Sequence, residues 1–116
     1  MNRYIQDRWG DSLKHGFVVV PSELFKQQRK LQLDCNELVV VMNLLTFWHS
    51  NDEPPILSLR ALEERMGLGT RSIQRLIKSL ETKGLISVEK GVGERRVNLQ
   101  LIADKLAQQT KTGQSD

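Results

Sequence analysis

Residues 55–86 read PILSLRALEERMGLGTRSIQRLIKSLETKGLI, and this stretch decides the fold. Ser58 has the side chain of a helix N-cap, and the apolar residues after it recur at helical spacing until Gly67. A second helical pattern closes at Gly84, which stands where a left-handed helix cap favours glycine. A tight, glycine-containing turn joins the two patterns. We therefore expect short helices at residues 59–66 and 71–83.

The second helix has two chemically different faces. Its apolar residues gather within roughly 100° of arc, and they are Ile73, Leu76, Ile77 and Leu80. The opposite face carries Arg71, Gln74, Arg75, Lys78 and Thr82. The apolar stripe would dock this helix on the domain, which leaves a basic face for a partner.

Two segments that alternate apolar and polar residues follow, at residues 85–88 and 97–101. The glycine-rich residues 91–94 lie between them and indicate the turn of a β-hairpin. Two helices, a tight turn and a hairpin in this order predict a winged helix-turn-helix. The expected fold class is mainly α with a small β-hairpin (α+β).

The predicted arrangement presents side chains that read duplex DNA. In the major groove Arg pairs with the guanine edge and Gln with the adenine edge, each good pair contributing roughly 1–3 kcal/mol of discrimination. Hydroxyls and free N–H groups at a helix start hold phosphate. The expected recognition-helix contacts are Thr70, Arg71, Ser72, Gln74, Arg75 and Lys78. The expected backbone contacts of the preceding helix are Ser58 and Arg60, and those of the wing are Lys90, Gly91, Gly93, Arg95 and Arg96.

The net charge of +3 is small, but it is unevenly distributed along the chain. Residues 34–57 hold four acidic residues and no Lys or Arg, a net charge of −4. Residues 58–101 hold nine basic and five acidic residues, a net charge of +4. A basic face opposite an apolar stripe is also what a solvated surface helix shows. Segregated charge together with the turn, the caps and the hairpin favours an electrostatic partner, duplex DNA.

A long apolar helix is predicted ahead of this unit, at residues 35–49. Asp34 and Glu37 have the spacing of a capping box, and the apolar residues that follow cover nearly the whole circumference. Such a helix lies in the centre of a core or is covered by another subunit. Before it, residues 17–20 predict a short strand or extended segment, and residues 22–30 a helix that turns Leu24 and Phe25 inward.

The chain's 116 residues support one domain with one core. We expect a polar N-terminal arm at residues 1–16, the winged-helix domain at residues 17–101, and a C-terminal part at residues 102–116. That last part is expected to contain a short helix over residues 102–109 and a frayed tail.

Several classes of protein are excluded. Cys35 is the only cysteine, so no disulfide forms within the chain, which fits a reducing cytoplasm. Two histidines and one cysteine are too few for a standard zinc site. The longest apolar stretch spans eleven residues, against about 20 for a membrane span. No phosphate loop or dinucleotide fingerprint is present. We expect a cytoplasmic protein that is not an enzyme and uses no cofactor, metal or membrane.

Residues 55–86 resemble the winged helix-turn-helix domains of bacterial, phage and plasmid replication initiators and small transcriptional regulators. The residues that carry the resemblance are Ser58, Leu62, Met66, Gly67, Thr70 or Ser72, Arg75, Ile77, Leu80 and residues 83–86. With the run at 17–21 and the helix after Asp34, the resemblance covers roughly residues 17–101. It implies the fold and DNA binding. Gly69 departs from it, because a serine often caps the recognition helix there; we expect Thr70 to take that role.

We expect sequence-specific binding of double-stranded DNA by a small transcriptional repressor of bacterial, phage or plasmid type. One alternative is a replication-initiation or partition protein that binds origin repeats. Another, of a different class, is a protein-interaction module without DNA binding that docks through the acidic residues 34–57. A homodimer through the apolar helix 35–49 or the N-terminal arm is expected, because one module buries limited surface on DNA. The alternative is a monomer that uses this helix as its core.

Overall fold

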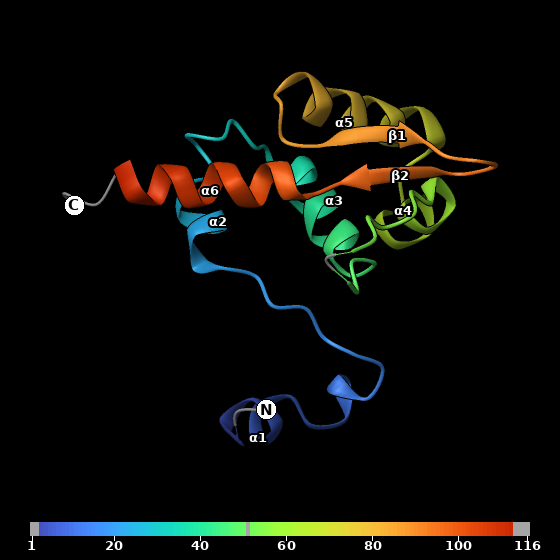
Figure 1. The fold of residues 1–116 in the computed structure, drawn as a ribbon. Coiled ribbons are helices and arrows are strands. Elements are labelled where there is room, and N and C mark those ends of the chain that lie inside the picture. The colour runs from blue at the N-terminus through green and yellow to red at the C-terminus, as the bar shows by residue number, and fades with distance from the viewer. Residues whose placement is uncertain (1–2, 51, 113–116) are drawn as a thin grey trace.

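The protein is mainly helical and carries one two-stranded antiparallel hairpin in the part described by its computed structural model, residues 3–50 and 52–112 (Figure 1). The helices are α1 (Arg3–Trp9), the 3-10 helix η1 (Gly10–Leu13), α2 (Ser22–Lys26), α3 (Cys35–Leu45), α4 (Leu59–Met66), α5 (Thr70–Thr82) and α6 (Gln100–Thr112). The strands are β1 (Ser87–Lys90) and β2 (Arg95–Asn98). The predicted class, mainly α with a hairpin, is confirmed.

The two strands of the hairpin are confined to residues nearer the turn than the sequence pattern predicts. The strands pair from Ser87 with Asn98 at the base to Lys90 with Arg95 at the end. The prediction extended the strands over 85–86 and 99–101, and this part is wrong. Leu85, Ile86 and Leu99 are buried in the core instead, and residues 100–101 belong to the first turn of α6, where Leu101 is exposed.

A short extended segment lies along the second edge of β2. The Pro55 carbonyl accepts from the Val97 amide at 2.9 Å, and the Leu57 amide donates to the Arg95 carbonyl at 2.8 Å. This pairing fixes the segment before α4 against the hairpin. The helix pair and the hairpin are therefore one connected unit.

The core gathers apolar side chains from α3, α4, α5 and the hairpin. Val40, Val41 and Leu44 of α3 are fully buried. The other fully buried residues of this centre are Leu62, Ile73, Leu80, Leu85 and Val97. From the other side α6 adds Ile102 and Leu106, and Figure 1 shows α6 crossing beside α2. The helix α3 thus packs into the core of the same chain, although Val39 remains exposed.

The predicted capping box of α3 is confirmed, but the helix ends earlier than residue 49. The Glu37 amide donates to Asp34 Oδ1 at 2.8 Å, and the Asp34 amide donates to Glu37 Oε1 at 3.0 Å. At the other end Thr46 caps the helix and its hydroxyl donates to the Asn43 carbonyl at 2.6 Å. Beyond the helix, the backbone amides through Trp48 donate to the carbonyl three residues earlier, as in a 3-10 turn. The apolar pattern of the sequence therefore extends past the last α-helical residue.

Two other helices differ from the prediction in extent. The helix α2 spans only Ser22–Lys26 instead of residues 22–30, and Pro21 is its N-cap. Leu24 is buried as expected, whereas Phe25 is 46% exposed, so its predicted inward orientation is wrong. The helix α6 starts earlier than predicted, because Asn98 Oδ1 accepts from the Gln100 amide at 2.9 Å. It also ends later, at Thr112, so residues 110–112 of the tail predicted to be frayed are helical, and residues 113–116 lie outside the described part of the chain.

The N-terminal arm lies away from the rest of the protein, with α1 and η1 joined to α2 by an extended segment (Figure 1). Neither α1 nor η1 has a buried residue. The exposed apolar side chains of the arm and its extended segment are Tyr4, Trp9, Phe17, Val18 and Val19. The segment 17–20 is extended, as predicted, and pairs with no other strand within the described residues. The proposed domain boundaries stay predictions.

Within residues 3–50 and 52–112, no helix has the length and apolar character needed to cross a membrane.

Candidate nucleic-acid interface

The turn between α4 and α5 is held by caps that the sequence encodes locally. Ser58 Oγ accepts from the Ala61 amide at 3.1 Å and starts α4, as predicted. Gly67 ends α4 in the left-handed conformation, with φ at 68°. Because a residue with a Cβ is strained there, glycine at this position sets the angle between the two helices.

The start of α5 differs from the prediction by one residue. Gly69 is the N-cap and no side chain caps the helix, so the expected capping role of Thr70 is wrong. Thr70 is instead the first helical residue, and its Oγ1 donates to Glu63 Oε1 of α4 at 2.8 Å. This bond ties the two helices together. It also leaves the first amides of α5 without a side-chain partner, which favours an anion at this end.

The end of α5 is a Schellman motif. Gly84 has φ at 72°, its amide donates to the Glu81 carbonyl at 2.9 Å, and the Leu85 amide donates to the Leu80 carbonyl at 3.1 Å. Leu80 and Leu85 are both fully buried. The predicted glycine stop is confirmed, and it aims the chain into the hairpin.

The two faces predicted for α5 exist. Ile73, Ile77 and Leu80 are buried and Leu76 is partly buried against the core. The exposed residues are Arg71, Ser72, Gln74, Arg75, Lys78 and Thr82. Thr70 is exposed as well, although its hydroxyl is bonded to Glu63. Across the described part of the chain, none of the exposed cations of α5 makes an ion pair.

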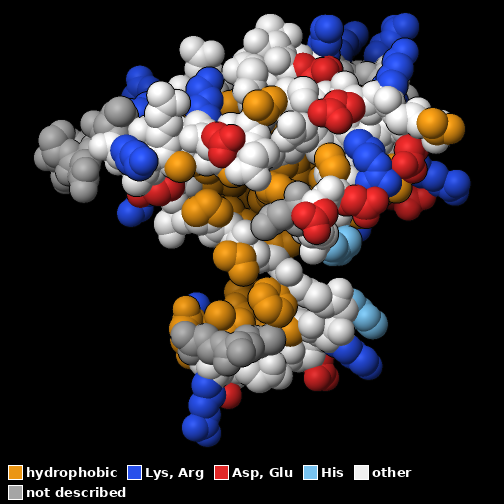
Figure 2. All heavy atoms as spheres, viewed as in Figure 1, with side chains coloured by type: hydrophobic (Ala, Val, Ile, Leu, Met, Phe, Trp, Pro, Cys, Tyr) orange, Lys and Arg blue, Asp and Glu red, His pale blue; other side chains and the backbone are white. Residues whose placement is uncertain are grey.

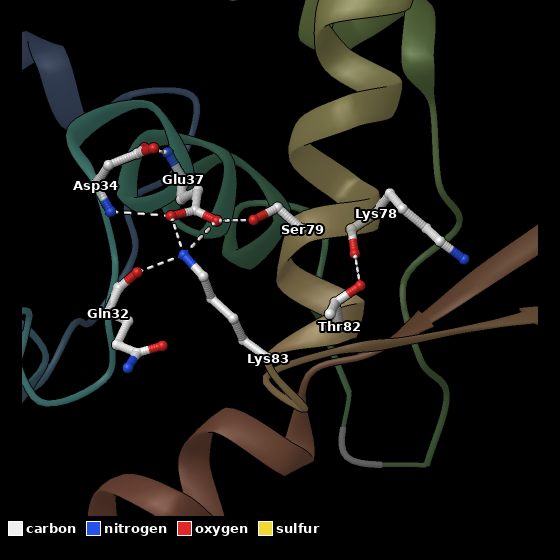
Figure 3. A network of polar contacts seen from close by, with 7 residues as sticks. All are labelled: Gln32, Asp34, Glu37, Lys78, Ser79, Thr82 and Lys83. Carbon is white, nitrogen blue, oxygen red and sulfur yellow. Dashed lines mark hydrogen bonds and ion pairs between the residues drawn. The ribbon is translucent and has the colours of Figure 1, made fainter.

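The fourth cation of this segment, Lys83, has a different environment. Its Nζ donates to Glu37 Oε1 at 2.6 Å, to Glu37 Oε2 at 2.8 Å and to the Gln32 carbonyl. Ser79 Oγ donates to Glu37 Oε2 at 2.6 Å. Figure 3 shows these groups converging between α3 and α5, while the Lys78 amine points away from them. The network fixes α5 on α3 and so orients the exposed face.

Glu37 is 1% exposed, yet it is held in its charged form. Burial by itself raises the pKa of Glu37. The hydrogen bonds from the Asp34 amide, Lys83 and Ser79, with the attraction of the Lys83 charge, outweigh burial and bring the pKa below 4.5. The carboxylate therefore stays ionised at neutral pH, and the network is a buried ion pair.

The hairpin places two of its predicted wing cations at its end. Lys90 and Arg95 face each other as the last pair of the strands, and both are exposed. Between them the turn is closed by the Gly91 amide, which donates to the Glu94 carbonyl at 2.6 Å. Gly93 has φ at 76°, a conformation that favours glycine. Figure 1 shows this end projecting beyond the helices.

Arg96, the third predicted wing cation, is turned to the loop before α4. Its Nη1 donates to the Pro54 carbonyl at 2.6 Å, and its Nη2 lies 3.0 Å from Glu94 Oε1. Glu53 Oε1 is 3.8 Å from the same nitrogen. These bonds neutralise the guanidinium and hold the loop before α4, so the charge available to an anion lies on Lys90 and Arg95.

The two residues at the start of α4 that are predicted to contact the DNA backbone have different environments. Ser58 is partly buried and its hydroxyl already serves as the helix cap. Arg60 is exposed and pairs with Glu64 one turn later at 3.3 Å. Such an exposed i, i+4 pair is weak, so Arg60 can exchange it for a phosphate. Among the described residues, no cluster of His, Cys, Asp and Glu is arranged to hold a metal ion.

Figure 2 shows Lys and Arg side chains at the edge of the molecule over α5 and at the end of the hairpin. Arg71, Arg75 and Lys78 thus lie along the exposed part of α5, and Lys90 and Arg95 lie at the end of the hairpin that follows it. Sequence reasoning missed the Glu37–Lys83 pair, whose members are 46 residues apart. The one available signal was a carboxylate on a helix expected to be apolar all round, which needs a buried partner.

A family model described as the DnaD N-terminal domain matches residues 20–116 of this chain. The crystal structure of the N-terminal domain of DnaD protein from Geobacillus kaustophilus HTA426 is similar to the whole chain, with a TM-score of 0.70 and 23% sequence identity. The alignment covers 99% of this chain and 96% of that one. No match was found among curated proteins.

Proposed function

This chain belongs to the DnaD N-terminal domain family, and from that membership we propose that it acts in bacterial replication initiation by binding duplex DNA. DnaD is a replication-initiation protein. The family therefore favours the replication alternative over the transcriptional repressor that the sequence pattern placed first. The protein acts without catalysis, in the cytoplasm, by occupying DNA.

The observation that carries this proposal is the exposed, unpaired basic face of α5. Arg71, Arg75 and Lys78 are separated by three or four residues, so their side chains follow one face of the helix. Gln74 lies among them and supplies an amide for an adenine edge. Among the described residues no Asp or Glu pairs with these three cations, so their charge stays available to a partner.

The arrangement of α4, α5 and the hairpin supports a winged helix-turn-helix assignment. In that assignment α5 is the recognition helix, α4 crosses the backbone with Ser58 and Arg60 near phosphates, and the hairpin is the wing. The pairing of residues 55–57 with β2 supplies the third short strand that such a unit uses. The proposed major-groove contacts are Thr70, Arg71, Ser72, Gln74, Arg75 and Lys78, and the proposed wing contacts are Lys90, Gly91, Gly93 and Arg95.

We also propose a homodimer, formed through the N-terminal arm rather than through α3. The central residues of α3 are buried in the chain's own core, so that helix has little surface to offer. The arm exposes Trp9, Phe17 and Val19. A groove of about 820 Å³ runs beside the extended segment, between the end of α3 and α6, and most of its lining is apolar. Sedimentation at micromolar concentration distinguishes dimer from monomer.

The proposal is tested by measuring affinity for a mixed-sequence duplex at low salt. Arg75→Ala and Lys78→Ala are each expected to weaken binding, and Lys111→Ala on α6 serves as the matched control. If neither α5 variant lowers affinity, the recognition-helix assignment is wrong.

Selection of bound sequences from random DNA then separates the biological roles. Tandem direct repeats support an initiator that binds an origin, whereas an inverted repeat indicates a dimeric transcriptional regulator. The protein-interaction alternative predicts no enrichment and no response of binding to salt.

A further inference from the structure

The outer side of α2 and of the turns after it carries one aromatic residue among three cations. Leu24 is buried, whereas Phe25 is 46% exposed. The other exposed side chains of this side, which together with Phe25 we call the α2 face, are Lys26, Arg29 and Lys30. A single exposed apolar residue is ordinary on a protein surface. An aromatic ring surrounded by cations, in contrast, is a combination that suits a particular kind of ligand.

The four residues share one side because the chain continues in helix-like turns beyond α2. The Gln27 amide donates to the Glu23 carbonyl at 2.8 Å, and the Leu31 amide donates to the Gln27 carbonyl at 2.9 Å. At about 100° per residue, positions 25, 26, 29 and 30 fall within roughly 140° of arc, opposite positions 24, 27, 28 and 31. Leu31 is buried like Leu24, as this division requires.

Hydrogen bonds on both sides of the segment hold the α2 face in place. The Leu33 amide donates to the Gln28 carbonyl at 2.9 Å, and Leu33 is buried. Lys83, at the end of α5, donates to the Gln32 carbonyl. Figure 1 shows α2 and the segment after it at the end of the molecule opposite the turn of the hairpin. The α2 face is therefore a fixed surface that is separate from the hairpin end.

No carboxylate forms an ion pair with the α2 face within the described residues. Glu23, before the face, accepts from Gln27 Nε2 at 2.9 Å, and Asp34, after it, accepts from the Glu37 amide at 2.8 Å. On α6, which packs against α2, Asp104 is bonded within its own helix. The positive charge of the face therefore stays available to an anionic partner.

The composition of the face identifies the form of that partner. It must offer negative charge and also a flat apolar surface for the Phe25 ring. Single-stranded nucleic acid offers both, because its phosphates lie beside bases that are free to stack on aromatic side chains. Paired bases in a duplex are stacked on each other. A membrane-surface helix needs a broad apolar side, whereas α2 has five residues and the face has one apolar side chain.

We propose that the α2 face binds single-stranded DNA, with one base stacked on Phe25 and with Lys26, Arg29 and Lys30 on the phosphates around it. Arg29 follows Phe25 by four residues, so the two side chains are neighbours. The inference goes beyond the proposed duplex binding, because it uses a separate surface and another form of DNA. Every base has a flat π face, so no sequence preference is expected.

The first test measures the affinity of the chain for a fluorescent oligo(dT) of twelve nucleotides, over a range of salt concentrations. Phe25→Leu, which keeps an apolar side chain but loses the ring, is expected to weaken binding about tenfold, as loss of one stacking side chain does. The slope of log affinity against log salt should not change. Phe25→Trp, which restores a ring, should bind at least as tightly as the unaltered chain. Because Phe25 is exposed, all three proteins should have similar melting temperatures.

The second test removes the cations. The Lys26→Ala/Arg29→Ala/Lys30→Ala variant is expected to reduce the magnitude of the salt slope for oligo(dT) by about 2.1, at about 0.7 for each phosphate contact on a single strand. Its matched control is Lys14→Ala/Lys105→Ala/Lys111→Ala, which removes the same charge from the arm and α6. The control should keep the slope of the unaltered chain.

Three results would overturn the proposal. They are oligo(dT) binding by Phe25→Leu equal to that of the unaltered chain, the same loss of slope in both triple variants, and binding to phosphatidylglycerol vesicles without binding to oligo(dT). Duplex affinity distinguishes this failure from failure of the proposed function. Phe25→Leu should bind duplex as the unaltered chain does, whereas Arg75→Ala and Lys78→Ala should weaken duplex binding.

Discussion

Lys78 and Lys83 lie five residues apart at the end of α5, and their surroundings are opposite. Lys78 is exposed and makes no ion pair with any described residue, whereas Lys83 donates two hydrogen bonds to a carboxylate that is 1% exposed. One lysine is available to a partner and the other is needed by the fold. Basic residues that are close in sequence therefore do not all belong to one exposed surface.

The same division applies to the arginines of the molecule. Arg65 lies over the Phe47 ring, 4.5 Å from its centroid, and donates to Thr46 Oγ1 at 2.9 Å. Arg96 is bonded to the loop before α4. In contrast, Arg71, Arg75 and Arg95 make no ion pair among the described residues. Within residues 58–101 the cations without an ion pair lie on α5 and at the end of the hairpin, which makes these two elements the candidate interface.

The largest expected effect is on folding stability, in Lys83→Ala. The substitution leaves the Glu37 carboxylate buried without its cation, which costs about 3 kcal/mol of the free energy of unfolding. For a domain of this size the melting temperature should fall by roughly 10 °C. Thermal unfolding followed by circular dichroism measures it.

Lys78→Ala is the matched control for that prediction. Its melting temperature should stay close to that of the unaltered chain, because the Lys78 amine contacts nothing in the network (Figure 3). Equal melting temperatures for the two variants would contradict the division between structural and available cations. Removing both charges together, in Glu37→Leu/Lys83→Met, should cost less than Lys83→Ala, since no unpaired charge remains.

A second, smaller effect is expected on the pH dependence of stability. The pKa of Glu37 is lower in the folded protein than the ordinary value of 4.5, so the unfolded chain takes up this proton first as pH falls. The stabilisation by Glu37 is therefore complete above pH 4.5 and is lost as the pH falls through the folded pKa. Glu37→Gln should flatten this part of the curve, measured by urea unfolding between neutral and acidic pH. A curve as steep as that of the unaltered chain would contradict the assignment.

The smallest expected effect separates Arg95 from Arg96. Arg96→Ala should lower stability by about 1 kcal/mol, because it removes the hydrogen bond to Pro54 and the contact with Glu94. Arg95→Ala should leave stability unchanged and instead reduce the magnitude of the salt slope of DNA binding by about 0.9. The reverse assignment of the two effects would show that the wing cations have been misplaced.

The elements predicted best are those whose ends are encoded by neighbouring residues. The helix α4 agrees with the prediction and α5 agrees within one residue, because Ser58, Gly67 and Gly84 act on the backbone within one turn. Where no neighbouring residue ends an element, the apolar periodicity of the sequence predicts an element that is too long. The predicted helix 35–49 is longer than α3, which ends at Leu45. The predicted strands include Leu85, Ile86 and Leu99, which are apolar because they lie in the core outside the strands.

The polar contacts that connect distant segments were not predictable in the same way. Lys83 and Glu37 are 46 residues apart, and Arg96 and Pro54 are 42 apart. A sequence pattern treats Lys83 like Lys78, and Arg96 like Arg95, because it shows the charge of each residue but not the groups to which the residue is bonded in the fold. The location of the candidate site on the second helix and the hairpin stays a prediction, and it includes more cations than the fold leaves without a partner.

The salt dependence of duplex affinity tests the central claim, that α5 and the hairpin bind DNA, most directly. Contacts to about four to six phosphates are expected, which give a slope of log affinity against log salt between roughly −3.6 and −5.4. The Arg71→Ala/Arg75→Ala/Lys78→Ala variant should retain its fold and lose up to about 2.7 of that slope. A flat salt response of the unaltered chain, or a triple variant with the same slope, would contradict it.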